Sequence, residues 1–232
     1  MLLLVEGEKA DVEIMKCLLT VYELSVDYEI ISYRTNIHQL YSDLFESDDP
    51  SDFDLLQLLK SRESDPEKHP IFDQRYSDIY LVFDLDPQDP RFDPHKLMQM
   101  ADYFCESSDM GKLYINYPMV ESFYHMKSIP DPEYNERTVS MDELYQKAYK
   151  KRVRNETCYR NYAHFAMDRQ SCSKVIKQNL AKANWMTNSS SDLPLQSPIL
   201  EAQLALIQQH SHVSVLSTCC FFIPEYQPSL LP

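Results

Sequence analysis

The chain has 232 residues and a formal net charge of −14; 44% of its residues are hydrophobic and 12% are aromatic. This composition excludes a disordered chain, and the length allows one domain with an appendage or two small domains. The six cysteines show no C-x-x-C spacing, which argues against a disulfide framework or a zinc site and favours buried thiols. The N-terminal apolar run is too short for a signal peptide, and no stretch of sequence approaches the length of a membrane span. We therefore expect a soluble, cytoplasmic protein with no membrane association.

The first 127 residues alternate between strand and helix patterns. Strands are predicted over 2–5, 28–33, 79–83 and 112–115, and helices over 9–21, 36–45, 94–105 and 118–127. Residues 46–78 are predicted to be irregular. Their acidic cluster, Asp48, Asp49, Asp52 and Asp54, is interpreted as solvated surface, with a metal or inhibitory role as the alternative. Strand and helix in alternation predict an α/β fold with a mainly parallel sheet flanked by helices.

The composition shifts after residues 128–132, and the pattern becomes helical. Ser140 and Glu143 form a capping-box signature for a helix that runs to about Arg154. Further helices are predicted over 159–167, 168–184 and 198–210, with a polar loop over 188–197 and a short strand or buried tail at 213–216. We therefore divide the chain into a domain of residues 1–130 and a mostly helical C-terminal region of residues 131–232.

Three carboxylates follow predicted strands at their carboxyl ends. Glu6 follows Leu2–Val5, and Asp84 and Asp86 follow the apolar run 79–83. Because residues two apart in an extended chain face the same side, Asp84 and Asp86 are expected to present paired oxygens. Hard carboxylates with no His/Cys pair nearby favour Mg²⁺ or Mn²⁺ over zinc. The chain has only two glycines, so Gly7, directly after Glu6, is interpreted as a tight turn or as space beside a ligand.

These motifs together resemble a known family. The stretch Val5-Glu6-Gly7-Glu8-Lys9-Ala10-Asp11 is similar to the first Toprim motif, a hydrophobic strand followed by E-G-x-x-x-D. Val82-Phe83-Asp84-Leu85-Asp86 is similar to the second, a strand-borne D-x-D. The resemblance covers residues 1–127. It implies a Rossmann-like sheet on which Glu6, Asp84 and Asp86 bind Mg²⁺ for phosphodiester chemistry.

The small size and helical tail look more like Toprim nucleases of the OLD type and of bacterial anti-phage systems than like topoisomerases or primases. The stretch 114–123 is similar to the N-x-P-x-x-E-x-F segment of those nucleases, and among them to the Toprim effectors of two-protein PARIS systems. In that interpretation Glu121 is an additional catalytic carboxylate; the alternative is an exposed acid at a helix N-terminus. The resemblance also implies a partner ATPase and a homodimer.

Six nearby side chains are secondary candidates. Each of them is either part of the site or an ordinary residue. The ordinary interpretation is a surface acid for the carboxylates, a solvated side chain for the lysines and a packing role for the histidine. They are Glu8, Lys9, Asp11, Asp89, His125 and Lys127.

The charge is distributed unevenly along the chain. Residues 146–187 contain ten Lys/Arg and two acidic residues, a net +8, so the rest of the chain carries −22. Cations pair with phosphates and tyrosines stack on unpaired bases, which favours nucleic-acid binding by this segment. A solvated helix or a patch for an acidic partner is the alternative. The cations are Lys147, Lys150, Lys151, Arg152, Arg154 and Arg160, interleaved with Tyr145, Tyr149, Tyr159 and Tyr162.

The sequence predicts a Mg²⁺-dependent (or Mn²⁺-dependent) Toprim endonuclease that cleaves RNA, such as tRNA, or DNA. We expect it to be a toxic effector in anti-phage defence that works with a partner ATPase. The alternative is a catalytically inactive regulatory or scaffold subunit, because the acidic surface also suits partner docking. A glycosyltransferase with a manganese-binding D-x-D is a third interpretation, against which the Glu6-Gly7 strand end and the small size argue.

Overall fold

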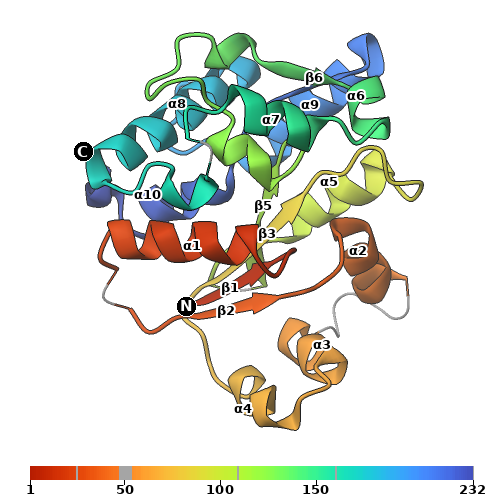
Figure 1. Cartoon of the computed structure of the whole chain (residues 1–232). Coiled ribbons are helices and arrows are strands. Elements are labelled where there is room, and N and C mark those ends of the chain that lie inside the picture. Colours follow the sequence, from red (N-terminus) through yellow and green to blue (C-terminus); the bar gives the residue numbers. More distant parts are fainter. Residues whose placement is uncertain (25, 47–53, 109, 160, 232) are drawn as a thin grey trace.

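The computed structural model describes residues 1–24, 26–46, 54–108, 110–159 and 161–231. At its centre is a five-stranded sheet with the strand order β2-β1-β3-β5-β4 (Figure 1). The strands β1, β2, β3 and β5 are parallel, and β4 runs antiparallel to β5. Their bounds are β1 Leu2–Val5, β2 Glu29–Ser32, β3 Ile79–Asp84, β4 Cys105–Glu106 and β5 Gly111–Asn116. The predicted α/β fold with a mainly parallel sheet is confirmed.

The two apolar runs that predicted strands form the middle of this sheet. All four residues of β1 are fully buried, and so are residues 80–83 of β3, as expected for strands that are covered on both faces. Val5 lies beside Val82, and Asp84 lies beside Asn116. This register brings the carboxyl ends of β1, β3 and β5 to one edge of the sheet.

Helices cover both faces. The helix α1 (Ala10–Val21) lies on one side together with α8 (Arg169–Thr187) and α10 (Phe222–Tyr226), whereas α2 (Ile37–Phe45) and α5 (Pro94–Tyr103) pack together on the other (Figure 1). These sides follow from the strand order, because right-handed crossovers place α1 opposite α2 and α5.

One prediction for residues 46–78 is wrong, and one predicted helix is two residues too long. Residues 46–78 are not irregular throughout, since they include α3 (Leu55–Arg62) and α4 (His69–Phe72). Asp54 caps α3 by accepting from the backbone of Leu56 and Gln57, while Asp48, Asp49 and Asp52 lie outside the described residues. The predicted helix 94–105 ends at Tyr103, because the chain then pairs with β5 as strand β4.

The α-helix predicted over residues 118–127 is also wrong. After a cis Tyr117–Pro118 bond the chain forms a five-residue 3₁₀ helix, η3 (Val120–Tyr124). The backbone beyond it bonds elsewhere: the Cys158 N–H donates to the Met126 carbonyl, and the Lys127 N–H donates to Asp131. These bonds hold the chain in a turn where an α-helix was expected.

The C-terminal half keeps the predicted capping residue but not one continuous helix. Ser140 accepts from the Glu143 N–H as predicted, but the helix is split into α6 (Met141–Tyr145) and α7 (Tyr149–Glu156). Lys147, between them, has a φ of 55°, which an α-helix does not accommodate. The helix predicted over 159–167 is wrong, because the described residues there form one 3₁₀ turn, η5 (Tyr162–His164).

The remaining C-terminal elements agree with the sequence pattern. Asp168 caps α8, and α9 covers Gln196–His210. The tail at 213–216 is a strand, β7 (His212–Ser214), which pairs with β6 (Thr138–Ser140). Shorter 3₁₀ helices are η2 Pro66–Lys68, η4 Tyr134–Glu136, η6 Cys219–Phe221 and η7 Pro228–Leu230.

One hydrophobic core runs from Met1 to Leu230. Phe222 of α10, for example, packs its ring 5.6 Å from that of Tyr80 in β3. The division at residue 130 stays a prediction. All six cysteines are free, but Cys105 and Cys158 are exposed, so burial of all the thiols was a wrong prediction. In the described part of the chain, no helix has both the length and the apolar character to cross a membrane.

Candidate functional site

A cleft of about 600 Å³ opens at the carboxyl ends of β1 and β3. Its floor includes Glu6 and Asp84 at the strand ends, Asp11 in the first turn of α1 and Glu121 in η3. Its other side is formed by α7 and the segment that follows, which lies over α1 (Figure 1). This is the edge of an open α/β sheet at which ligands bind.

The four floor carboxylates are close to one another and poorly hydrated. Asp11, Asp84 and Glu121 are at most 8% exposed. Glu6 Oε2 accepts a hydrogen bond of 3.0 Å from the backbone N–H of Asp84, which ties the two strand ends together. Asp11 Oδ1 and Glu121 Oε2 are buried without any hydrogen-bond partner. A buried carboxylate oxygen without a partner is costly, so each of these atoms is suited to a cation that the cleft would admit.

The electrostatics of the floor reflect this crowding. Burial, followed by the charge of Asp86, raises the pKa of Glu6 to about 8. Burial and the charge of Glu6 raise the pKa of Asp84 well above its usual range, and burial raises that of Asp11. Several carboxylates with raised pKa values in one desolvated cluster are typical of functional sites.

Asp86 lies just beyond the end of β3, beside the cleft. The strand β3 ends at Asp84, and Asp86 adopts a φ of 43°, so the two-residue alternation of an extended chain no longer applies. Asp86 lines an adjoining hollow of about 620 Å³ together with Lys9, and Glu6 lines both spaces. The expectation that Asp84 and Asp86 face the same side stays a prediction. Burial raises the pKa of Asp86 although the charges of His38 and Lys150 lower it, and the charge of Asp86 in turn raises the pKa values of Glu6 and Asp84.

Gly7 makes room for Asp11. A Cβ atom at Gly7 would lie 2.5 Å from Asp11 Oδ2, closer than atoms pack. Gly111, and not Gly7, has a positive φ, so the predicted tight turn is not the reason for glycine here. The second sequence interpretation, space beside the site, fits this geometry.

Sequence reasoning assigned no site role to Asn116, although this residue is the first of the N-x-P-x-x-E-x-F segment. It is fully buried at the end of β5, and its Nδ2 lies 3.5 Å from Asp84 Oδ1. Its own Oδ1 accepts from the Ser217 hydroxyl (3.0 Å) and the Cys219 N–H (3.3 Å). Asn116 thus connects Asp84 to the C-terminal segment. Its place at the end of a strand next to Asp84 is the signal that could have indicated this role.

The predicted basic residues divide into three groups. Lys150 and Arg154 line the cleft, and Lys150 forms a 2.9 Å ion pair with Glu121. Arg152 is turned away, since it bonds Glu143, Glu156 and the Thr138 carbonyl. Lys147 and Lys151 are exposed outside the cleft, and Arg160 lies outside the described residues.

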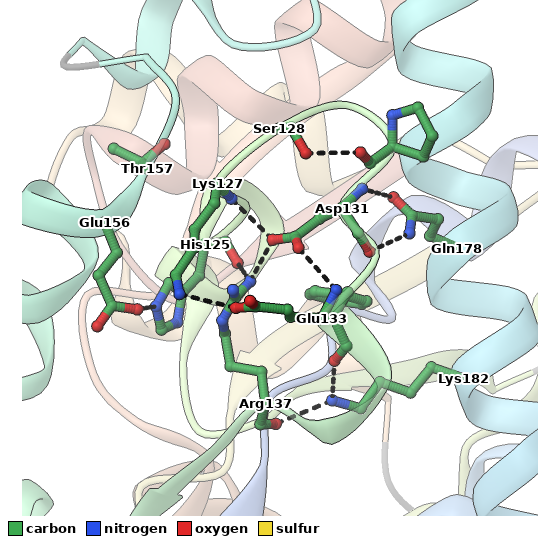
Figure 2. A network of polar contacts seen from close by, with 12 residues as sticks. His125, Lys127, Ser128, Asp131, Glu133, Arg137, Glu156, Thr157, Gln178 and Lys182 are labelled. Carbon is green, nitrogen blue, oxygen red and sulfur yellow. Dashed lines mark hydrogen bonds and ion pairs between the residues drawn. The ribbon is translucent and has the colours of Figure 1, made fainter.

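A buried polar network holds α7 from behind. The fully buried His125 bonds the hydroxyl of Tyr149 at the start of α7. It also bonds Glu156 at the end of α7 (Figure 2), so both ends of this helix are fixed. Arg137 donates to the carbonyl of His125 and to Asp131. This network orients α7 so that Lys150 and Arg154, four residues apart, face the cleft.

The secondary candidates mostly take ordinary roles. Asp89 is paired with Arg91 and Asn36, Glu8 with Arg34, and Lys127 with Glu133. Burial lowers the pKa of His125 to about 4, in keeping with the predicted packing role. Lys9 lines the cleft, and Asp11 is part of its floor. Glu121 is buried, so its interpretation as an exposed helix-terminal acid is wrong.

The donor set fits a hard divalent cation in its chemistry. The floor offers carboxylate oxygens, which Mg²⁺ and Mn²⁺ prefer, and two of these oxygens are buried without partners. Within the described residues, however, no three Asp, Glu, His or Cys side chains are already placed as a group that could hold a metal ion. Side chains would have to rotate toward a common point to bind one.

Comparison with known proteins adds no relative: no family model, no curated protein and no solved structure matches this chain.

Proposed function

We propose that this chain is a Toprim-type endonuclease that uses Mg²⁺ or Mn²⁺ to cleave nucleic acid. The observation that carries the proposal is the pair of unpartnered, buried oxygens of Asp11 and Glu121 beside Glu6 and Asp84. They lie at the ligand-binding edge of a parallel sheet and face cations across one cleft. The sequence motifs at Glu6, Asp84 and Asp86 support the same function.

In this proposal Glu6 and Asp84 hold the cation, and Asp86 and Glu121 are further carboxylates of the site. Asp11 joins these carboxylates because it lies on the cleft floor with an unpartnered oxygen. A bound cation would lower the pKa of a water molecule and offset charge on the phosphoryl oxygen. Asn116 orients Asp84 through its amide.

Lys150 and Arg154 bind the phosphates on either side of the scissile bond. The Lys150 side chain is 57% exposed and Arg154 is exposed as well, so their attraction to phosphates should weaken as the salt concentration rises.

From the resemblance we further propose a cytoplasmic effector of anti-phage defence that acts with a partner ATPase and as a homodimer. The alternative is a regulatory or scaffold subunit without catalysis. The observation that favours this alternative is the absence of a finished metal-ligand group among the described residues.

Mutation of the floor tests the proposal. The purified chain is incubated with Mg²⁺ or Mn²⁺ and a panel of RNA and DNA, with and without cellular partners. Glu6→Gln and Asp84→Asn should abolish cleavage and weaken Mn²⁺ binding measured by calorimetry. The matched control is Glu201→Gln, an exposed acid of α9 that does not line the cleft.

Cleavage at wild-type rates by both floor variants would show that the site assignment is wrong. Absence of cleavage by the wild-type chain under all these conditions would favour the regulatory alternative.

A further inference from the structure

The outer wall of the cleft is aromatic. It is formed by the segment between α7 and α8, from which Thr157, Tyr159, Asn161 and Tyr162 line the same space as the carboxylates. Tyr159 is 45% exposed, unlike the tyrosines of the core. The cleft therefore offers rings and polar groups on one wall and acids on its floor.

Tyr162 is held as a rigid platform. Its ring stacks on that of Tyr124, with centroids 5.5 Å apart and planes 22° apart. Tyr124 is buried, and Glu13 of α1 is near enough to the hydroxyl of Tyr162 to raise its pKa. The ring of Tyr159 is supported edge-on by Phe165, with centroids 6.1 Å apart. Little side-chain freedom is left to lose when a flat ligand stacks here.

Cations are present in the same space as this wall. Lys150 and Arg154 project from one face of α7 into the cleft, and Arg154 is near enough to Tyr124 to lower the pKa of its hydroxyl, against a larger effect of burial. Flat rings next to cations are the combination that binds unpaired nucleotides, whose bases stack and whose phosphates pair with the cations. A duplex keeps its bases stacked inside and would present only its backbone.

We propose that the cleft binds an unpaired nucleotide segment, with a base against Tyr159 and Tyr162 and the adjoining phosphate at Lys150 and Arg154. The volume of about 600 Å³ is that of a small-ligand pocket, so it suits a short stretch of single strand. Thr157 and Asn161 supply polar groups for the base edge. This inference rests on the proposed function and narrows its substrate to unpaired nucleic acid, either RNA or single-stranded DNA.

Binding without cleavage tests the inference separately from catalysis. Fluorescence anisotropy is measured on the full chain with labelled single strands of RNA and of DNA of about 12 nucleotides and with matching duplexes. Each titration is done in EDTA and again in Mg²⁺. The single strands should bind at least roughly 10-fold more tightly than the duplexes, and the RNA and DNA arms show which source is preferred.

Variants assign the binding to the wall. Tyr159→Ala and Tyr162→Ala should each weaken single-strand binding roughly 5- to 100-fold, whereas Tyr159→Phe keeps the ring and the affinity. The matched control is Tyr145→Ala, because Tyr145 is 62% exposed in α6 and does not line the cleft. Tyr159, which is the more exposed of the two, serves if the Tyr162 variant fails to fold.

The outcomes separate the two proposals. Tyrosine-dependent binding of single strands without any cleavage would support the inference and contradict the proposed nuclease. Cleavage that needs Glu6 and Asp84 but not the tyrosines would overturn the inference and leave the nuclease standing. Equal binding of duplex and single strand, or an equal loss on Tyr145→Ala, would also overturn it.

Discussion

The buried Lys182 makes the free energy of unfolding depend on pH. Its side chain is fully buried and donates to the carbonyls of Tyr134 (2.7 Å) and Arg137 (2.9 Å), as Figure 2 shows. Burial, followed by the charge of the Arg137 guanidinium, lowers the pKa of Lys182 from 10.5 to about 7. Between these two values the unfolded chain holds a proton at Lys182 that the folded chain has released.

The free energy of unfolding therefore rises with pH in that window. The slope is at most about 1.4 kcal/mol per pH unit, and integration from pH 7 to pH 9 gives roughly 2 kcal/mol. Below pH 7 both states hold the proton, so this contribution no longer changes. Lys182→Met removes the titrating group while keeping most of the volume.

Urea unfolding followed by circular dichroism at pH 7, 8 and 9 measures this effect. The difference in unfolding free energy between wild type and Lys182→Met should grow by roughly 2 kcal/mol from pH 7 to pH 9. Lys174→Met, an exposed lysine of the same helix, is the control and should leave the wild-type profile unchanged. Parallel profiles for wild type and Lys182→Met would refute the reasoning.

Three further predictions concern the site and its support. Gly7→Ala pushes a Cβ atom against the Asp11 carboxylate, so Mn²⁺ affinity measured by calorimetry should fall roughly 10-fold or more with little change in melting temperature; equal loss of folding would mean that the glycine is only structural. Arg152→Met should lower the unfolding free energy by about 1–3 kcal/mol without affecting nucleic-acid binding. Arg154→Met should weaken nucleic-acid binding without lowering the unfolding free energy. The opposite pattern in melting and anisotropy experiments would contradict the assignment of these two arginines. Gly111→Ala should destabilise the fold by more than about 1 kcal/mol in urea unfolding, because φ is +106° and the new Cβ would lie 2.7 Å from Leu81; unchanged stability would show that β5 can shift.

The sheet and its acidic edge could be predicted because their signals are local. Continuous apolar runs mark β1 and β3, and a carboxylate at the end of each is visible in the sequence itself. The backbone conformation of Asp86 could not be predicted, because a left-handed φ, which Asp tolerates, leaves no pattern in the sequence. The two-residue spacing of Asp84 and Asp86 was therefore interpreted as that of an extended strand.

The other wall of the cleft depends on contacts that are distant in sequence. The wall residues Thr157, Tyr159, Asn161 and Tyr162 show no periodicity in the sequence, and Tyr162 is held by its stacking on Tyr124. In the same way, Lys150 and Arg154 of α7 face the cleft because the bond between His125 and Glu156 fixes the helix on its opposite side. Sequence composition indicated the basic and aromatic residues but not which of them would share a space.

The bond between Asn116 and Ser217 joins residues 101 positions apart. Because a chain is made from its N-terminus, Glu6 and Asp84 leave the ribosome before the groups that fix Asn116. The strands of the sheet can form as they emerge, but Asp84 is not held in its final orientation until Ser217 and Cys219 follow. For the nuclease proposed above, cleavage would therefore begin only after Ser217 and Cys219 have been made.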